Sequence, residues 1–399
     1  MAQALAGLKV LDLTQLLAAP QIAATLGDFG ADVIKIESKD GDPLRKMGAN
    51  PQGSSPQWKL VSRNKRALSL DLDHAEGQRI FQALVAQADV LIENLTPGLL
   101  ERWQCTYPLL AASNPRLIVV SVSCYGRTGP YADRPGAGTL AEAFGGFAHL
   151  NGEADGPPLV PSLPLGDTLT GMSGVIGTLM ALYSRDRAGQ GTARGQQVDV
   201  AMIDPILQLM SLPLVMHDGR EPSPMRMGSR IAGGVPRNLY RCGDSEWLAL
   251  SGTTDRQVAR ILEVIGQDTE AGKARYGSAK DRLQVADELD GLVAEWIAAR
   301  ERSAVLDAFL KARIPVAPVN DLAALLEDPH LRARASVTSL PDGAGAEVSV
   351  FSPTPTLSET PGTHRSVGPS IGAHNASILS DWLDLPAEEI AELQRLGAI

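Results

Sequence analysis

The sequence has little of what marks a secreted, membrane-bound or nucleic-acid-binding protein. Its three cysteines, Cys105, Cys124 and Cys242, have no paired spacing, which is typical of a reducing compartment. Acidic residues outnumber basic ones by 46 to 36, and the net charge of −10 argues against a nucleic-acid or anionic membrane surface. The longest apolar segment, Leu169 to Tyr183, is broken by glycines and is short for a membrane span. With no visible signal peptide, we expect a cytoplasmic protein without nucleic-acid or membrane partners.

Several common catalytic motifs are absent as well. No G-x-G-x-x-G follows the first predicted strand, where the chain reads DLTQLLAAP from Asp12 to Pro20. There is no phosphate-binding G-x-x-x-x-G-K-[ST] loop, no H-E-x-x-H and no G-x-S-x-G. The six histidines are scattered, so we predict no metal site. These absences disfavour a nicotinamide oxidoreductase and leave an intracellular α/β enzyme as the predicted class.

What the first half does contain is an alternation of short apolar runs with helical patterns. Strands are predicted at Lys9–Leu13, Asp32–Glu37, Asp89–Glu93, Leu117–Val122 and Gln197–Ala201, and helices at Pro20–Phe29 and His74–Ala86. For the second helix we expect Asp73 as the N-cap, with Glu76 completing a capping box. Strands that alternate with helices predict a parallel sheet and a large, Rossmann-like α/β domain.

The domain boundaries follow from breaks in this pattern. Residues 1–210 are the predicted large domain, and 211–237, rich in proline and glycine, are a predicted linker. A hairpin of Asn238–Arg241 and Trp247–Ser251 then opens a smaller α+β domain, 238–325.

The last segment, 326–399, is predicted to return to the large domain and end in a helix. Asp328 followed by Pro329 is a typical helix start. A long connection is expected from Leu340 to Ser377, followed by an amphipathic helix at Ala387–Leu396.

One acidic residue stands out at a predicted helix start. The segment Pro164-Leu165-Gly166-Asp167-Thr168 opens an apolar helix rich in small residues that runs to Tyr183. An aspartate there most often serves as an N-cap. The free N–H groups and the positive end of the helix also favour an ionised carboxylate, which can attack an acyl carbon. The helix start alone leaves both roles open for Asp167.

A series of short motifs, each weak alone, runs in order along most of the chain. They are DLT at 12–14, GADVIKIE at 30–37, NKR at 64–66 with LDL at 70–72, ADVLIEN at 88–94, NPRL at 114–117, YG at 125–126 with GP at 129–130, GD at 166–167, VDVA at 198–201, PVAPVN at 315–320 and DPHL at 328–331. In this order they resemble the family III CoA transferases, the group that includes formyl-CoA transferase and carnitine CoA-transferase.

The resemblance implies a mechanism, a substrate class and an assembly. Asp167 falls on the family's nucleophile, which forms an aspartyl–acyl anhydride and then an aspartyl–CoA thioester. The substrates would be an acyl-CoA donor and a carboxylic acid acceptor, with succinyl-CoA as the donor suggested by family habit. The family's homodimer consists of two interlocked, ring-like chains, and the long linkers predicted here fit that arrangement.

The resemblance also implies a set of CoA contacts. The residues at the matching positions are Gln15, Leu17, Ala18, Leu70, Asn94, Leu95, Thr96 and Arg102. The family's frequent arginine is Ser38 in this chain, and a lysine of some members is Asp73. Lys39, beside Ser38, is a candidate phosphate partner by its charge, as is Arg45.

Two other functions remain open. A related α-methylacyl-CoA racemase needs a base on each side of the α-carbon. At the positions of its histidine and the neighbouring residue this chain has Ala137 and Gly138, which argues for transfer. Gly138 also replaces an acidic residue of several transferases, and Glu142, one turn further on, is a candidate substitute. A non-catalytic CoA-binding protein is the third possibility.

Overall fold

The chain folds into two compact units. The computed structural model describes residues 3–48, 55–188, 193–217, 219, 224–342 and 345–399. The large unit comprises Met1–Phe147, Val160–Val215 and Ala333–Ile399, and the small unit comprises Ala148–Leu159 and Met216–Arg332. The domain boundaries and roles expected from the sequence stay predictions.

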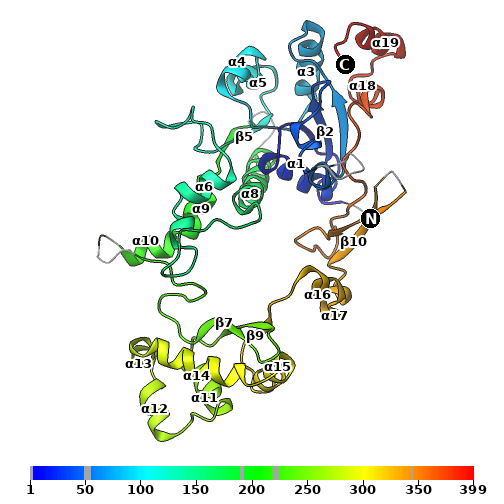
Figure 1. Cartoon of the computed structure of the whole chain (residues 1–399). Coiled ribbons are helices and arrows are strands. Elements are labelled where there is room, and N and C mark those ends of the chain that lie inside the picture. The colour runs from blue at the N-terminus through cyan, green and yellow to red at the C-terminus, as the bar shows by residue number, and fades with distance from the viewer. Residues whose placement is uncertain (1–2, 49–54, 189–192, 218, 220–223, 343–344) are drawn as a thin grey trace. The chain divides into compact units, whose positions relative to one another are not determined.

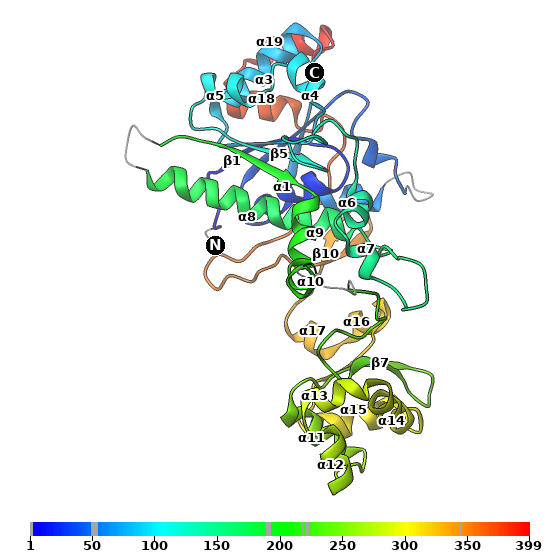
Figure 2. The same cartoon turned by 90° about the vertical axis from the view of Figure 1, so that its left-hand side faces the viewer.

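The large unit is built on a six-stranded parallel sheet (Figures 1 and 2). Its strands are β1 (Lys9–Leu13), β2 (Asp32–Glu37), β3 (Lys65–Ser69), β4 (Val90–Glu93), β5 (Ile118–Ser123) and β6 (Gln197–Ala201). They stand in the order β3-β2-β1-β4-β5-β6, which is the order of dinucleotide-binding folds. Strands β1 to β3 are added toward one edge of the sheet and β4 to β6 toward the other, so the switch point lies between β1 and β4. The predicted α/β class with a parallel sheet is confirmed, although β3 was not among the predicted strands.

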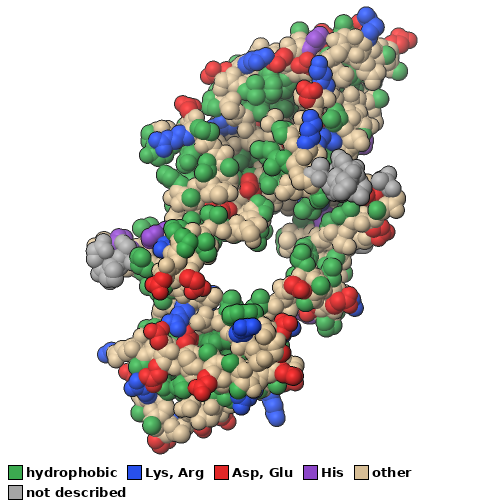
Figure 3. Space-filling model, viewed as in Figure 1, with side chains coloured by type: hydrophobic (Ala, Val, Ile, Leu, Met, Phe, Trp, Pro, Cys, Tyr) green, Lys and Arg blue, Asp and Glu red, His purple; other side chains and the backbone are tan. Residues whose placement is uncertain are grey.

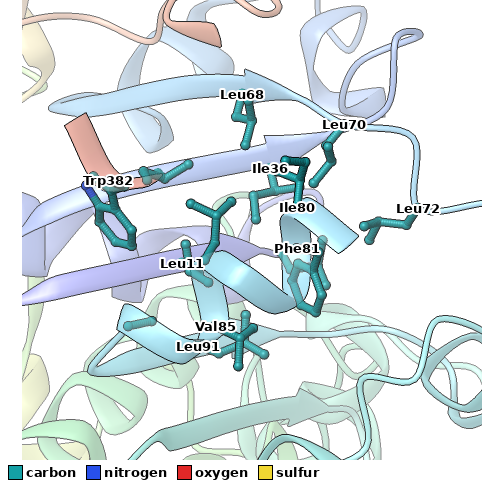
Figure 4. Packing of buried hydrophobic residues seen from close by; sticks show 14 of the residues in the cluster. Leu11, Ile36, Leu68, Leu70, Leu72, Ile80, Phe81, Val85, Leu91 and Trp382 are labelled. Atoms are coloured by element: carbon teal, nitrogen blue, oxygen red, sulfur yellow. The ribbon is translucent and has the colours of Figure 1, made fainter. Parts of the chain in front are cut away.

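Helices cover both faces of this sheet (Figure 2). One face carries α3 (Ala75–Gln87), α5 (Tyr107–Ser113), α18 (Asn375–Leu383) and α19 (Ala387–Arg395); the other carries α1 (Ala18–Asp28) and α8 (Leu165–Arg187). Successive strand residues point to opposite faces, so Leu11 lies on the first face and Val10 on the second. Figure 4 shows Phe81 and Trp382, from α3 and α18, packed in the first core.

The remaining short elements connect these layers and the small unit. In the large unit they are η1 (Pro43–Arg45), α2 (Pro56–Val61), α4 (Pro97–Arg102), α6 (Gly138–Phe144), α9 (Ile203–Leu209), β10 (Val337–Pro341) and β11 (Glu347–Phe351). The small unit contains α16 (Leu322–Glu327), and the unit boundaries fall within α7 (Phe147–Leu150), α10 (Ser211–His217) and α17 (Pro329–Ala333). Among the described residues, none of these helices or the others is long and apolar enough to cross a membrane.

Helix α8 lies close against α1 because glycines line the contact. A Cβ on Gly174 would stand 2.2 Å from Ile22 Cδ1, and one on Gly171 would stand 3.0 Å from Gln21 Cβ. The hydroxyl of Thr170 donates to the Gly166 carbonyl at 2.7 Å, so this polar side chain is satisfied within the helix. The glycines therefore allow α8 to approach α1 closely, and this contact fixes where α8 begins relative to α1.

The small unit has its own antiparallel sheet and core. Strands β7 (Arg237–Arg241), β8 (Trp247–Ser251) and β9 (Val316–Pro318) form the sheet. It packs with helices α11 (Asp255–Val264), α12 (Glu270–Tyr276), α13 (Ala279–Gln284), α14 (Ala286–Ala298) and α15 (Arg302–Lys311). The predicted hairpin of β7 and β8 is confirmed, with Arg237 paired to Ser251.

Two of the predicted connections contain regular secondary structure. The predicted linker 211–237 begins with helix α10, and its residues 218 and 220–223 lie outside the described residues. The connection expected over 340–377 contains strand β11, which pairs with β10, and its residues 343–344 lie outside the described residues. The helix start at Asp328 is confirmed, because its Oδ1 accepts the N–H of His330 at 2.9 Å.

The N-cap predicted for α3 is wrong. His74 caps this helix, accepting the Glu76 N–H on Nδ1 at 3.1 Å, whereas Asp73 lies one residue before the cap. The Oδ1 atom of Asp73 instead accepts from Trp103 Nε1 at 2.7 Å. The Asp73 side chain is therefore directed toward the end of α4 rather than the start of α3.

The last segment completes the large unit. The Asp71 N–H donates to the Ala398 carbonyl at 2.9 Å, and the Asn64 N–H donates to the Ser366 carbonyl at 3.1 Å. Ile378 and Leu379 of α18 are fully buried in the core that α3 shares with the sheet. Residues from the two ends of the chain thus form one core, and the predicted C-terminal helix is confirmed as α19.

Candidate functional site

Asp167 lies in the first turn of α8 and is not its N-cap. The helix begins at Leu165 with Pro164 as the N-cap residue, and no side chain caps it. Asp167 is the third helical residue, and its side chain is half-buried. The capping interpretation of this aspartate is therefore wrong, and its carboxylate is left beside the positive end of a 23-residue helix.

Helix α6 packs against this first turn from the side. A Cβ on Gly138, the first residue of α6, would stand 2.4 Å from Asp167 Oδ2. On the same face of α6, the Glu142 carboxylate accepts the Gly166 N–H on Oε1 at 2.8 Å. Any residue with a Cβ at position 138 would clash with the Asp167 carboxylate in its present position.

The surroundings make Asp167 more basic than an ordinary aspartate. Burial raises its pKa above the usual 3.8, and the nearby negative charge of Glu142 raises it further. A hydrogen bond from the residue's own backbone N–H lowers it, but the net shift is upward. A more basic carboxylate is a better nucleophile once it is ionised.

A cavity of about 240 Å³ with both polar and apolar walls lies at the carboxyl ends of β1, β2, β3 and β4, beside the point where the strand order reverses. Open α/β sheets bind their ligands at this edge. Its walls come from the turns after these strands and include Gln15, Ser38, Leu70, Asp73, Leu95 and Trp103. Three of the predicted CoA contacts, Gln15, Leu70 and Leu95, therefore line one cavity.

Other predicted contacts support this cavity without lining it. The side chain of Asn94 holds the turn after β1, because Oδ1 accepts the Gln15 N–H and Nδ2 donates to the Gln15 carbonyl, both at 2.9 Å. Ala18 is the buried first residue of α1, and Thr96 is the N-cap of α4. Leu17 packs against the small core of Leu44, Trp58 and Val61.

The start of α1 has free backbone donors. Leu17 is the N-cap residue, and no side chain hydrogen-bonds to the N–H groups of the first turn. Leu16 has a φ of +66°, which turns the chain sharply between β1 and this helix. A helix start of this kind is suited to bind phosphate.

The positively charged residues expected to bind the phosphates of CoA are placed differently from the prediction. Arg102 forms an ion pair with Asp73, with Nη2 2.9 Å from Oδ1, so it is exposed but not free. Lys39 is exposed and does not line the cavity, although Ser38 does. Arg45, the other candidate by charge, is held by Glu37 at 2.9 Å through Nε and stacks on Trp58. The phosphate role suggested for Arg45 by its charge is therefore not supported.

Sequence reasoning missed a buried ionic network beneath the cavity. Lys65 Nζ lies 2.7 Å from Asp12 Oδ2, and Lys35 Nζ lies 3.3 Å from Asp42 Oδ2. Lys35 Nζ also donates to the Thr14 carbonyl, so the network braces the turn after β1. The available signal was a charged residue at an inward position of each apolar strand, Asp12 in β1 and Lys35 in β2.

Across the residues that the structure describes, no three His, Cys, Asp or Glu side chains lie close enough to hold a metal ion.

The fold and site define a doubly wound α/β protein with a ligand cavity at its switch point and a basic aspartate at a helix start. The model of CoA-transferase family III matches residues 5–375, and the chain belongs to this family. It is 38% identical to the succinyl-CoA–L-malate CoA-transferase beta subunit of Chloroflexus aurantiacus, over 98% of this chain and 96% of that one. It is 30% identical to the formyl-CoA:oxalate CoA-transferase of Rhodopseudomonas palustris, over 100% of this chain and 98% of the relative.

Solved structures agree with the family. A CAIB/BAIF family protein from Brucella suis is 30% identical and superposes with a TM-score of 0.83, covering 96% of this chain and 100% of that one. The family and the enzyme class predicted from the ordered motifs, a CoA-transferase, are confirmed.

Proposed function

We propose that the protein moves CoA from an acyl-CoA to a carboxylic acid through covalent intermediates on Asp167. The observation that carries this is the basic, half-buried Asp167 carboxylate held at a helix start against the Cβ-free Gly138. The carboxylate attacks the thioester carbonyl, the C–S bond breaks, and an aspartyl–acyl anhydride and CoA thiolate result. The thiolate then attacks the aspartyl carbonyl, which releases the donor acid and leaves an aspartyl–CoA thioester. The acceptor carboxylate reverses these two steps.

We propose the cavity at the switch point and the start of α1 as the CoA site. Gln15, Leu70 and Leu95 would contact the ligand directly, while Asn94 and Thr96 would hold the turns around it. The free N–H groups after Leu17 suit a phosphate. Arg102 would bind phosphate after leaving Asp73, and Lys39 would act from the rim.

For the acids, we propose succinyl-CoA as donor and a dicarboxylic acid as acceptor. The support is the higher identity to the succinyl-CoA–L-malate enzyme, 38%, than to the formyl-CoA:oxalate enzyme, 30%. Selectivity among acids depends on a few polar groups in the pocket, so this proposal rests on similarity alone.

The proposed chemistry is tested by trapping the intermediate. The protein is incubated with a panel of acyl-CoAs, quenched with hydroxylamine and analysed by peptide mass spectrometry. We expect a hydroxamate at Asp167 that forms with succinyl-CoA and is absent in Asp167→Ala. CoA binding without any adduct would contradict transfer and favour a non-catalytic CoA-binding protein. Exchange of an α-proton without an adduct would favour the racemase.

We further propose that two copies assemble into the interlocked homodimer of the family. One face of α8 supports this, since Met172, Ile176, Leu179, Met180 and Tyr183 recur at helical spacing and are exposed, the last two by 67% and 65%. Figure 3 shows hydrophobic side chains exposed over the large unit. A second copy would cover this face, which a monomer would leave in water.

Light scattering and subunit exchange test the assembly. We expect a dimer mass, no exchange between differently tagged dimers without unfolding, and loss of the dimer in Met180→Glu. A stable monomer in the native protein would contradict the proposal. The cytoplasmic location and the absence of nucleic-acid and membrane partners stay predictions.

A further inference from the structure

Glu142 is a buried carboxylate without a cation. It is 2% exposed, and Oε1 accepts the Gly166 N–H at 2.8 Å. No Lys, Arg or His lies within ion-pair distance of it among the residues described by the structure. Burying an unpaired carboxylate is costly, so such a group calls for an explanation beyond packing.

Its position relates it directly to Asp167. The N–H that Glu142 binds belongs to Gly166, the residue before the nucleophile. Gly138, one helical turn before Glu142, touches the Asp167 carboxylate. Glu142 thus occupies one of the free donors of the α8 start and adds a negative charge beside it, which opposes the stabilising effect of the helix end.

Among the described residues, no other charge acts on Asp167 in this way. Helix α8 packs against α1, α6, α9, β5 and β6. The charged residue of α1, Asp28, is neutralised by Arg63, with 2.6 Å between Oδ2 and Nη2. Asp204 on α9 and Asp199 on β6 are not among the groups that shift the pKa of Asp167, whereas Glu142 is. Strand β5 carries no charged side chain.

We propose that Glu142 is a positioning residue that destabilises the anionic form of Asp167 and so directs the aspartyl–acyl anhydride toward aspartyl–CoA. This inference rests on the proposed function. CoA thiolate can attack either carbonyl of the anhydride. Attack on the acyl carbonyl expels the Asp167 carboxylate and restores the donor, whereas attack on the aspartyl carbonyl expels the donor acid. The more basic carboxylate is the poorer leaving group, so a negative charge beside Asp167 favours the forward step.

The test compares Glu142→Gln with the native protein. Glutamine keeps the shape and an oxygen acceptor for the Gly166 N–H but removes the charge. Glu388→Gln, the same change at an exposed site in the first turn of α19, is the matched control. Each protein is mixed with succinyl-CoA without an acceptor acid, quenched in acid, and analysed by intact mass for the fraction carrying covalent CoA. The acid limb of the kcat/KM profile for transfer is measured in parallel.

For Glu142→Gln we expect the CoA-bearing fraction to fall by about fivefold or more, given the strength of a nearby charge in a partly buried site. The acid limb should move to lower pH, because the pKa of Asp167 falls when the charge is removed. Its melting temperature should be no lower than that of the native protein, and Glu142→Asp, which keeps the charge, should retain the native acid limb.

The outcomes separate the two proposals. If Glu142→Gln folds and has the native CoA-bearing fraction and the native acid limb, this inference is wrong while the Asp167 mechanism stands. If the native protein itself forms no adduct at Asp167, the proposed function fails, and the role of Glu142 fails with it. Should Glu142→Gln not fold, a changed acid limb in Glu142→Asp would equally overturn the inference.

Discussion

At the scale of single residues, the site depends on the absence of a Cβ atom at Gly138. Gly138→Ala would place a methyl group 2.4 Å from the present position of Asp167 Oδ2, so the carboxylate must turn away. We expect kcat to fall by at least about 100-fold, because small misplacements of a reacting group are costly. CoA affinity measured by calorimetry should stay unchanged. Gly98→Ala, on α4 with open space around it, is the control, and native activity in Gly138→Ala would contradict the geometry.

The charge on Asp167 should also affect stability. The raised pKa means that the folded protein binds this proton more tightly than the unfolded chain does. The group therefore favours folding below its usual pKa of 3.8, and that contribution is lost as the pH rises through the raised value. At about pH 7 the carboxylate opposes folding. We expect Asp167→Asn to be inactive but to melt higher than the native protein at about pH 7, with the advantage gone near pH 3. A lower melting temperature at neutral pH would contradict this.

Asp73 offers a test of the CoA site. It lines the cavity and holds Arg102, so it both repels phosphate and occupies a potential phosphate ligand. Asp73→Asn should tighten CoA binding by about twofold to fivefold, the range expected for an exposed pair, and the gain should shrink with salt. Asp381→Asn, which breaks the surface pair with Arg66, serves as the control. Equal affinity of Asp73→Asn and the native protein would count against the cavity as the CoA site.

How much the sequence foretold at this scale varies from residue to residue. It singled out Asp167 through its motif and Gly138 through the comparison with a related racemase, and the structure places the two side by side. It could not tell that Glu142 is buried, because burial depends on how α6 packs on α8. It assigned the α3 cap to Asp73 by residue preference, whereas the turn geometry gave the cap to His74 and left Asp73 to Arg102.

At the scale of elements, the contact of α8 with α1 determines the position of the nucleophile. Gly174→Ala would put its Cβ 2.2 Å from Ile22 Cδ1 in a closely packed contact. Overpacking of this kind costs about 1–3 kcal/mol, and the shift of α8 should reduce turnover as well. Denaturant unfolding measures the first effect and steady-state kinetics the second. In Gly174→Ala,Ile22→Val the lost methyl makes room, so stability should partly return; no recovery would argue against this contact as the cause.

Strand prediction succeeded where apolar residues mark the strand and failed where charged residues open it. β1, β2 and β6 have the predicted bounds because apolar residues dominate them or flank them clearly. β3 was missed because it begins with Lys65 and Arg66, which resemble a surface segment. Only the fold brings Lys65 to Asp12 and so makes a lysine suitable for a strand interior.

At the scale of the whole molecule, the large unit depends on the last helices. Deleting 375–399 removes α18 and α19 and with them the buried Ile378, Leu379, Trp382, Ile390, Leu393 and Ala398. Burial of one large apolar side chain contributes about 1.5–3 kcal/mol, so the sum over the five large ones is comparable to the whole net stability of a typical domain. We expect the truncated chain to lack a cooperative melt and to bind no CoA. Deleting 387–399 alone should be less severe, and a native-like melt in the longer deletion would contradict the prediction.

The family, the class of sheet and the enzyme type could be predicted at this scale because ordered motifs span nearly the whole chain. The pairing of Asp71 with Ala398 could not, since no local pattern records a contact between residues so far apart.

That contact has a consequence for how the protein is made. The first sheet strands leave the ribosome early, but two of the helices that cover one of their faces, α18 and α19, are synthesised only after residue 374. During translation, the part of this apolar face that α18 and α19 cover stays exposed to water and to other nascent chains until these helices have been synthesised. Faithful production of the enzyme therefore depends on protection of an unfinished sheet, and chaperone supply or translation speed should limit its yield more than its final stability does.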